Sequence, residues 1–305
     1  MKVLTPRCFL ISIFLSVLLV ACGGGGSDSS STSSSSTTRT PSVSLATPAG
    51  TPCLTSTKST DVFGSTNYTV FQTINASTWG CLLVNKSDGQ PVFDGNQSLR
   101  FEVRPGDCNA NSGWSDCAND RSRWELQSDD LKWASTQGKI ITYQYYVYVP
   151  YQPQILPPTR TDVRDRTAQT LLSQLNWYSR TNKDTTTGHS IMAGLYVNES
   201  GGFYVLTNKD FGYTPNQKIL IDTNPYDKWI KMTYVVKSTT AADGYIKIYA
   251  NDKLVVDETR ATLPDTDCTT LIRIGFYNTF LSVTSLAWQT QVAYFDGMST
   301  TVTNF

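Results

Sequence analysis

Two stretches that alternate like β-strands, Leu271–Tyr277 and Arg121–Leu126, contain the residues best suited to chemistry. Because strand side chains point alternately to opposite faces, Arg273 and Tyr277 share a face, with Gly275 between them. They lie about 13 Å apart along the strand, and the glycine leaves space for a ligand to approach the backbone. A tyrosine beside arginines can act as a general acid or base, because the cations stabilise its phenolate.

A second set of charged residues flanks the loop from 104 to 120. Alternation predicts that one face of each flanking strand carries arginines and carboxylates, and that the two strands are neighbours in one sheet. The set comprises Arg100, Glu102, Arg104, Arg121, Arg123 and Glu125. Guanidinium forks match carboxylate or sulfate, so the pattern favours a surface that grips anions. The alternative is a sheet face whose charges pair only with one another.

Polar residues and the single histidine supply further candidates. Gln174 and Asn176 share a face of the strand expected over Leu171–Tyr178, where amides can hydrogen-bond a substrate carboxyl group. His189 is expected in a turn before the strand Ile191–Val197. It is either a general base that reaches a groove or an exposed loop residue without a role.

The segment from residue 98 to 126 resembles a family signature. Gly106-Asp107-Cys108, Asp116-Cys117 and the run from Asp120 to Leu126 are similar to the pattern of heparin-lyase-I-like polysaccharide lyases. The resemblance extends from about residue 60 to the C-terminus. It implies a concanavalin-like jelly roll, an all-β sandwich of two curved antiparallel sheets. It also implies β-elimination on a polysaccharide that contains uronic acid.

The resemblance also implies roles for individual residues. Tyr277 stands where the family has its catalytic tyrosine, and Arg273 replaces a family lysine. Asn176 stands where the family has a histidine base, and an amide cannot remove a proton. Arg121, Arg123, Gln174, Asn176 and Arg273 are expected to bind substrate and to neutralise its carboxylate. The base is then Tyr277 itself, His189 or another tyrosine.

The N-terminus predicts export. Residues 1–21 have a charged start and an apolar run of about a dozen residues that ends before Cys22, as in a lipoprotein signal peptide. Ordinary secretory cleavage is the alternative. Residues 22–48 are rich in glycine and serine and form a flexible tether, and residues 49–305 form the folded domain. We expect an exported bacterial lipoprotein that is anchored to a membrane at Cys22, on the periplasmic or cell-surface side.

Export implies an oxidising compartment, so disulfides are expected. Cys108 and Cys117 flank a short loop and are predicted to pair. A second pair among Cys53, Cys81 and Cys268 remains open. The sequence predicts no metal site and no cofactor, because it lacks closely spaced cysteines and has one histidine. A structural calcium bound by Asp61 or Asp296 is the exception considered.

Composition limits the partners. The formal net charge is +0 and no basic block occurs, which disfavours nucleic acid. Strand patterns from 140 to the C-terminus indicate one all-β domain, expected to be a monomer that binds an anionic polysaccharide.

The main alternative to a lyase is a glycan-binding protein derived from a lyase, in which tryptophans such as Trp124 and Trp177 form the platforms that contact sugar rings. A glycoside hydrolase is third, because no strand supplies the closely spaced carboxylates that it needs.

Overall fold

The structure is a computed structural model of the whole chain. It describes residues 43–53, 59–64, 68–72, 78–109, 115–128, 134–151, 169–181, 189–197, 201–209, 211–281 and 289–305. The expected signal peptide, Cys22 and the tether as far as residue 42 lie outside the described residues. Arg39–Phe305 form one compact unit.

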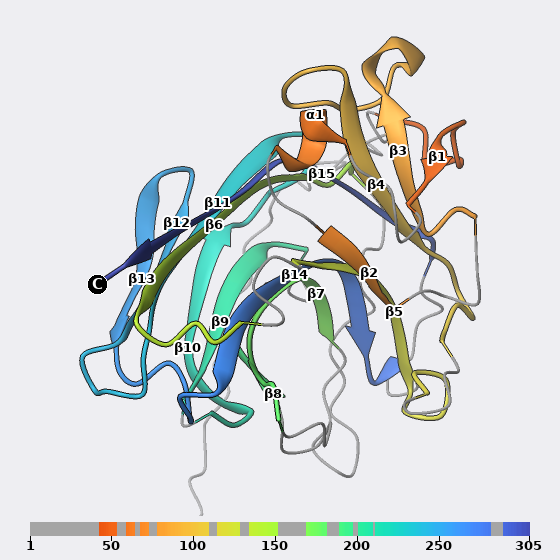
Figure 1. Cartoon of the computed structure of the whole chain (residues 1–305). Helices are drawn as coiled ribbons and strands as arrows, with labels where there is room; N and C mark the ends of the chain where they lie inside the picture. Colours follow the sequence, from red (N-terminus) through yellow and green to blue (C-terminus); the bar gives the residue numbers. More distant parts are fainter. Residues whose placement is uncertain are drawn as a thin grey trace, which may run out of the picture. The chain divides into compact units, whose positions relative to one another are not determined.

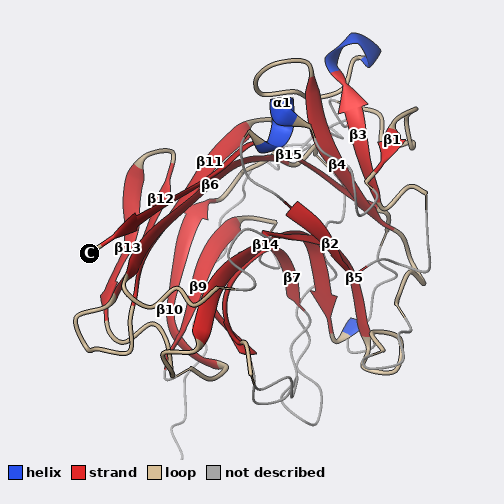
Figure 2. Ribbon diagram, viewed as in Figure 1, coloured by secondary structure: helices blue, strands red, loops and turns tan. Residues whose placement is uncertain are grey.

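Strands dominate the described residues, with one short α-helix, α1 (Thr60–Phe63), and one 3-10 helix, η1 (Lys86–Asp88) (Figure 2). Among the described residues, no helix combines the length and the hydropathy that a membrane crossing requires. The strands form two sheets whose named strand pairs are all antiparallel.

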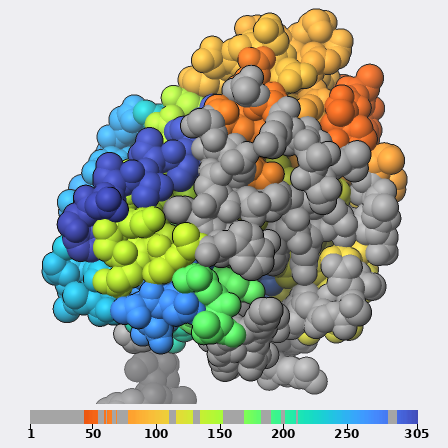
Figure 3. Space-filling view, in the orientation of Figure 1, coloured from red at the N-terminus to blue at the C-terminus, as the bar shows by residue number. Residues whose placement is uncertain are grey.

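The first sheet, called the large sheet below, has eight strands in the described chain. Their spatial order is β1-β3-β4-β15-β6-β11-β12-β13. Their bounds are β1 (Thr51–Pro52), β3 (Cys81–Asn85), β4 (Gln97–Val103), β6 (Lys139–Tyr148), β11 (Trp229–Ser238), β12 (Tyr245–Ala250), β13 (Lys253–Thr259) and β15 (Gln291–Asn304). The end of β15 lies beside the start of β6 at the surface (Figure 3).

The second sheet, called the small sheet below, has seven strands in the described chain. Their spatial order is β10-β9-β8-β7-β14-β5-β2. Their bounds are β2 (Tyr68–Gln72), β5 (Arg121–Ser128), β7 (Gln169–Ser179), β8 (His189–Val197), β9 (Phe203–Lys209), β10 (Thr214–Asp222) and β14 (Cys268–Thr279). Figure 1 shows both sheets curved, with the small sheet on the inside of the curve.

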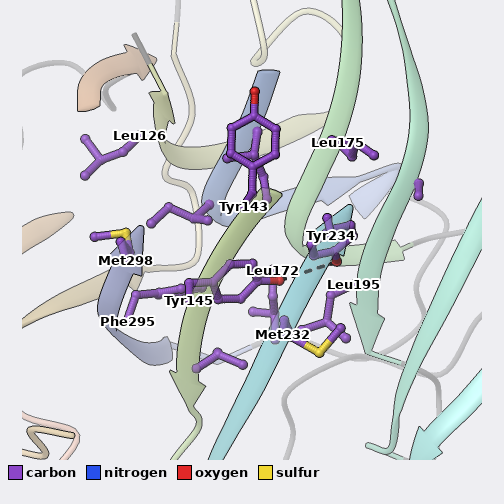
Figure 4. Packing of buried hydrophobic residues seen from close by; sticks show 14 of the residues in the cluster. Leu126, Tyr143, Tyr145, Leu172, Leu175, Leu195, Met232, Tyr234, Phe295 and Met298 are labelled. Carbon is purple, nitrogen blue, oxygen red and sulfur yellow. Dashed lines mark hydrogen bonds between the residues drawn. The ribbon is translucent and has the colours of Figure 1, made fainter. Parts of the chain in front are cut away.

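The hydrophobic core lies between the two sheets. Alternate residues of each strand enter it, as the period of two requires, and Ile272, Ile274 and Phe276 of β14 are buried there. Figure 4 shows Tyr145 and Tyr234 pointing toward one another among these side chains. The all-β sandwich of two curved antiparallel sheets expected from the sequence is therefore confirmed.

One expectation about strand pairing is wrong. β4 pairs with β3 and β15 in the large sheet, whereas β5 pairs with β14 and β2 in the small sheet. Phe101 of β4 and Trp124 of β5 both face the shared core. The charged side chains of the two strands therefore point away from each other, on opposite outer faces of the sandwich.

The charged side chains of β4 bind one another and the segment that precedes β1. Glu102 is buried and accepts hydrogen bonds from Arg100 at 2.5 Å and from Arg104 at 2.5 Å. Arg100 also donates to the carbonyl of Leu45 at 3.0 Å, and Thr47 donates to Glu102 at 2.8 Å. The segment from residue 43 packs on this face, so the folded unit begins before residue 49, within the range assigned to the tether.

Two disulfides join described cysteines. Cys108 pairs with Cys117, as the sequence predicts, and Cys53 pairs with Cys81. Cys268 is buried and free at the start of β14. The second pairing, which the sequence left open, follows from the position of Cys53 beside β3, where its backbone N–H donates to the carbonyl of Cys81.

Candidate active site

The site lies on the concave face of the small sheet, where β14 runs between β5 and β7. Tyr277 is in register with Arg123 on β5 and with Leu171 on β7. Four residues earlier, Arg273 is in register with Gln127 and Gln174. Non-local pairing of β5 with β14 thus brings Arg121 and Arg123 close to Tyr277, although the strands are far apart in sequence.

Arg123 is the electrostatic centre of this face. Its guanidinium forms a bidentate pair with Asp116, in which Nη2 donates at 2.7 Å and Nε at 2.9 Å. Its Cζ lies 3.9 Å from the ring centroid of Tyr277, within cation–π range. Burial acts to lower the pKa of Arg123, but the neighbouring phenol and carboxylates outweigh burial and raise the pKa above its ordinary value.

Glu125 links Arg123 to the amide pair on β7. Its Oε2 lies 3.5 Å from Nη1 of Arg123, and its Oε1 accepts a hydrogen bond from Gln174 at 2.5 Å. Burial raises the pKa of the Glu125 carboxyl, against the opposing effects of Arg123 and Arg273. Gln174 therefore has a fixed orientation beneath the site, with one amide hydrogen committed to this carboxylate.

Asn176 is completely buried next to Gln174. Its Nδ2 donates to the backbone carbonyl of Gln174 at 3.1 Å. Its buried Oδ1 has no hydrogen-bond partner among the described residues. Asn176, the expected donor to a substrate carboxyl group, thus donates one amide hydrogen within the protein. Its acceptor oxygen has no partner in the part of the chain that the structure describes.

Arg273 is also enclosed, with 3% of its surface exposed. Its Nε donates to Gln127 Oε1 at 3.1 Å. Burial lowers the pKa of Arg273 to about 10, and the charge of Glu125 opposes this shift. The side chain remains a cation at neutral pH and contributes positive charge beneath the face.

Arg121 differs from the other two arginines. Its Cζ lies 4.0 Å from the ring centroid of Phe280 and 6.0 Å from that of Tyr277. Of the described residues, none accepts a hydrogen bond from its buried Nε and Nη1. Arg121 and Tyr277 are only partly buried, so they are the members of this group that solvent reaches.

Gly275 has a different role from the one the sequence suggests. It has a φ of +124°, at the point where the register between β14 and β7 shifts. A Cβ there would lie 2.1 Å from the carbonyl oxygen of Trp124 and 3.0 Å from Phe101. The missing side chain therefore points at β5 and the core, and glycine is needed for the backbone rather than for a ligand.

His189 is not brought close to Tyr277 by the strand register. It is the first residue of β8 and pairs with Tyr178, which pairs with Thr269 of β14. Thr269 precedes Tyr277 by eight positions, about 26 Å along a strand. The backbone of His189 thus lies near the opposite end of these strands, and its side chain is outside the described set.

An apolar wall that the sequence did not predict continues the face beyond β7. Tyr196 of β8 and Tyr204 of β9 stack with ring centroids 5.2 Å apart, and Tyr277 packs against the same cluster. The exposed Lys218 lies 4.4 Å above the Tyr204 ring. The alternation of side chains along β9 is the sequence signal for this wall.

A loop tyrosine was also missed. Burial and the neighbouring Tyr277 raise the pKa of Tyr213, and the charges of Arg273, Arg121 and Arg123 oppose this shift only in part. The Tyr213 side chain, which is 61% exposed, thus lies within electrostatic reach of the site. It follows Gly212 in a turn, and no periodicity marks it in the sequence.

Two further expectations concern tryptophans and calcium. Trp124 and Trp177 belong to the core between the sheets, so the prediction that they form glycan platforms is wrong.

The two carboxylates considered for calcium are engaged with the backbone. Asp61 accepts a hydrogen bond from the backbone N–H of Asn96, and Asp296 accepts one from the backbone N–H of Phe93. The described residues contain no cluster of three histidine, cysteine or acidic side chains that could hold an ion. The structural calcium stays a prediction.

Comparison with known proteins identifies the family. No curated protein matches the sequence. Among solved structures, an endo-beta-1,4-glucuronan lyase from the fungus Trichoderma reesei matches at 14% identity, covering 82% of this chain and 93% of that one, with a TM-score of 0.48. Alginate lyase AlgAT5 from Polysaccharide Lyase family 7 matches at 14% identity over 80% of this chain and 98% of that one, with a TM-score of 0.47. The marine alginate lyase AlyA1 from Zobellia galactanivorans matches at 15% identity over 70% and 81%, with a TM-score of 0.44.

A family model described as polysaccharide lyase matches residues 63–299, which is more than half of the chain. The match includes β5, β7 and β14, whose side chains form the site on the concave face. The chain therefore belongs to the polysaccharide lyase family.

Proposed function

We propose that the chain cleaves a polysaccharide containing uronic acid by β-elimination, with Tyr277 as the group that transfers the proton. The observation that carries this proposal is the position of the Tyr277 phenol. Tyr277 is partly exposed, and its ring centroid lies 3.9 Å from Cζ of Arg123 and 6.0 Å from Cζ of Arg121. Within the family, the resemblance of residues 98–126 suggests the heparin-lyase-I-like group.

The proposed reaction needs three kinds of group. The proton on C5 of a uronate is weakly acidic, and positive charge near the carboxylate stabilises the enolate-like intermediate. Arg121, which is partly buried, supplies charge nearest to solvent, and Arg273 and Arg123 supply charge beneath it. Gln174 and Asn176 each retain one amide hydrogen to direct at the carboxyl group.

Tyr277 completes the reaction as base and then as acid. As the phenolate, it takes the C5 proton. The electron pair of that C–H bond forms the C4–C5 double bond as the C4–oxygen bond breaks. The phenol then gives its proton to the leaving glycosidic oxygen, which restores the phenolate. His189 is the alternative base, and the eight-residue offset of its backbone from Tyr277 weighs against it.

The reaction is tested with the soluble unit, residues 39–305, mixed with a panel of uronate polymers. β-Elimination leaves an unsaturated uronate that absorbs ultraviolet light, whereas hydrolysis and simple binding do not. We expect an absorbance rise with one polymer. No rise across the panel, together with retention on one polymer, would instead identify a glycan-binding protein in which Asn176 marks lost chemistry.

Arg121 is expected to set the affinity for the polymer. Among the described residues, its buried Nε and Nη1 have no hydrogen-bond partner, so a carboxylate that reaches them would satisfy both. A charge-assisted hydrogen bond contributes about 1.5–3 kcal/mol. We therefore expect Arg121→Gln to raise KM about 10- to 100-fold with a smaller change in kcat. Steady-state kinetics by ultraviolet absorbance measures both constants.

Arg180→Gln is the matched control for Arg121, because Arg180 follows β7 and pairs with Asp267 at 3.2 Å. Its KM should stay within about twofold of wild type, since partly exposed ion pairs contribute little. An unchanged KM in Arg121→Gln would show that Arg121 does not bind the polymer.

We also propose that the chain is a monomeric lipoprotein anchored at Cys22, with the enzyme facing external polymer. The apolar run before Cys22 and the glycine- and serine-rich stretch after it support this proposal. Labelled palmitate should enter the full-length protein, and Cys22→Ala should release it from membranes. A Cys22→Ala protein that stays bound to the membrane would contradict the anchor.

A further inference from the structure

The loop closed by the Cys108–Cys117 disulfide carries Asp116 to the site, although Asp116 is remote from β14 in sequence. Asp116 has 0% of its surface exposed and pairs with Arg123, which in turn packs on Tyr277. We propose that Asp116 is a positioning residue for Tyr277 and acts through Arg123. This inference rests on the proposed function, because it names a group that supports the same proton transfer.

Backbone contacts fix the position of Asp116 on both sides. Its N–H donates to the carbonyl of Asn109 at 2.7 Å, and its own carbonyl accepts from the N–H of Arg121 at 2.9 Å. The next residue, Cys117, is covalently linked to Cys108 and also donates to the Asn109 carbonyl, at 3.3 Å. The carboxylate is therefore held by a loop closed between Cys108 and Cys117, which are nine positions apart.

The geometry of the pair determines where the guanidinium lies. Nε of Arg123 donates to both carboxylate oxygens, at 2.9 and 3.1 Å, and Nη2 donates to Oδ1 at 2.7 Å. A bidentate fork fixes the plane of a guanidinium as well as its position. The same plane presents Cζ to the Tyr277 ring at 3.9 Å.

Glu125 cannot replace Asp116 in this role. Its contact with Arg123 is longer, at 3.5 Å to Nη1, and its other oxygen is occupied by Gln174. Without the Asp116 carboxylate, Glu125 is the anionic partner that remains to Arg123 among the described residues, and the guanidinium turns toward it. The guanidinium then leaves the Tyr277 ring, so the proton-transferring group loses the cation that orients it.

The test compares Asp116→Asn and Asp116→Glu with wild type on the polymer that gives product. Asparagine keeps the shape but presents an N–H group to the guanidinium, so kcat should fall about 30- to 100-fold. KM should stay within about threefold, because Arg121 remains in place. Glutamate keeps two acceptor oxygens and the charge, so Asp116→Glu should recover at least about fivefold over Asp116→Asn.

Asp267→Asn is the matched control, because it removes a carboxylate from another arginine, Arg180, at the far end of β14. Its kcat should stay within about twofold of wild type. Asp116→Asn with wild-type kcat, or an equal fall in Asp267→Asn, would overturn the proposal. If wild type gives no unsaturated product, the proposed function fails first, and this inference fails with it.

A second variant covers the case in which Asp116→Asn does not fold. The double substitution Cys108→Ser/Cys117→Ser leaves Asp116 and Arg123 intact but opens the loop that holds the carboxylate. A fall in kcat at unchanged KM, in a protein with a cooperative thermal transition, supports the positioning role. Wild-type kcat in this variant contradicts it.

Discussion

Replacing Tyr277 with phenylalanine should lower kcat about 1,000-fold while polymer binding changes by less than about threefold. The substitution removes only the hydroxyl group that carries the proton. The ring keeps its packing against Leu171, Tyr196 and the Arg123 guanidinium, so the concave face keeps its shape. The rate is measured by ultraviolet absorbance of the unsaturated product, and binding by calorimetry with the same polymer.

Tyr245→Phe is the matched control, since Tyr245 lies on β12 of the large sheet and is partly buried. Its kcat should stay within about twofold of wild type. Full activity in Tyr277→Phe would show that Tyr277 does not transfer the proton. A loss in His189→Ala as large as in Tyr277→Phe would show that a second group shares the proton transfer.

Replacing Gly275 with alanine should destabilise the folded unit by at least about 3 kcal/mol. Two effects add, because a φ of +124° is strained for any side chain and the new Cβ would lie 2.1 Å from the Trp124 carbonyl oxygen. The oxygen belongs to the backbone of β5 and cannot rotate away. Thermal unfolding should show a Tm about 6–12 °C lower for a unit of this size.

Gly89→Ala separates the two effects. Gly89 also has a positive φ, +71°, but a Cβ there would meet nothing within 4 Å. Its cost should be about 1 kcal/mol, from backbone strain alone. Equal losses at the two positions would mean that the close contact at Gly275 relaxes without cost.

Any Gly275→Ala protein that folds should also lose activity. The register shift at Gly275 sits between Arg273 and Tyr277, so a displaced β14 backbone moves both away from β5. The glycine therefore connects the packing of the sandwich to the geometry of the site.

The local pattern predicted much of the site face. Arg273 and Tyr277 lie opposite Ile272, Ile274 and Phe276, as alternation requires, because the period of two is a property of the strand itself. The pairing of Cys108 with Cys117 was also predictable, because the two cysteines are only nine positions apart and their loop closes locally.

Sheet membership was not predictable in the same way. The β4 and β5 strands are consecutive in sequence and both alternate, yet they join different sheets. Alternation specifies which residues share a face but not which strand lies alongside. That choice depends on hydrogen bonds with β15 and β14, which are more than a hundred residues away.

The sequence by itself determined the all-β class, the strand faces that carry Arg121, Arg123, Arg273 and Tyr277, and the family signature around Asp116. Those features depend on residues a few positions apart. Only the tertiary structure decided that Asp116 holds Arg123, that Arg121 keeps donors without partners in the described part of the chain, and that Gly275 is needed for a backbone shift. These depend on which strands pair and what they enclose, because burial and close approach arise only when distant segments of the chain pack together.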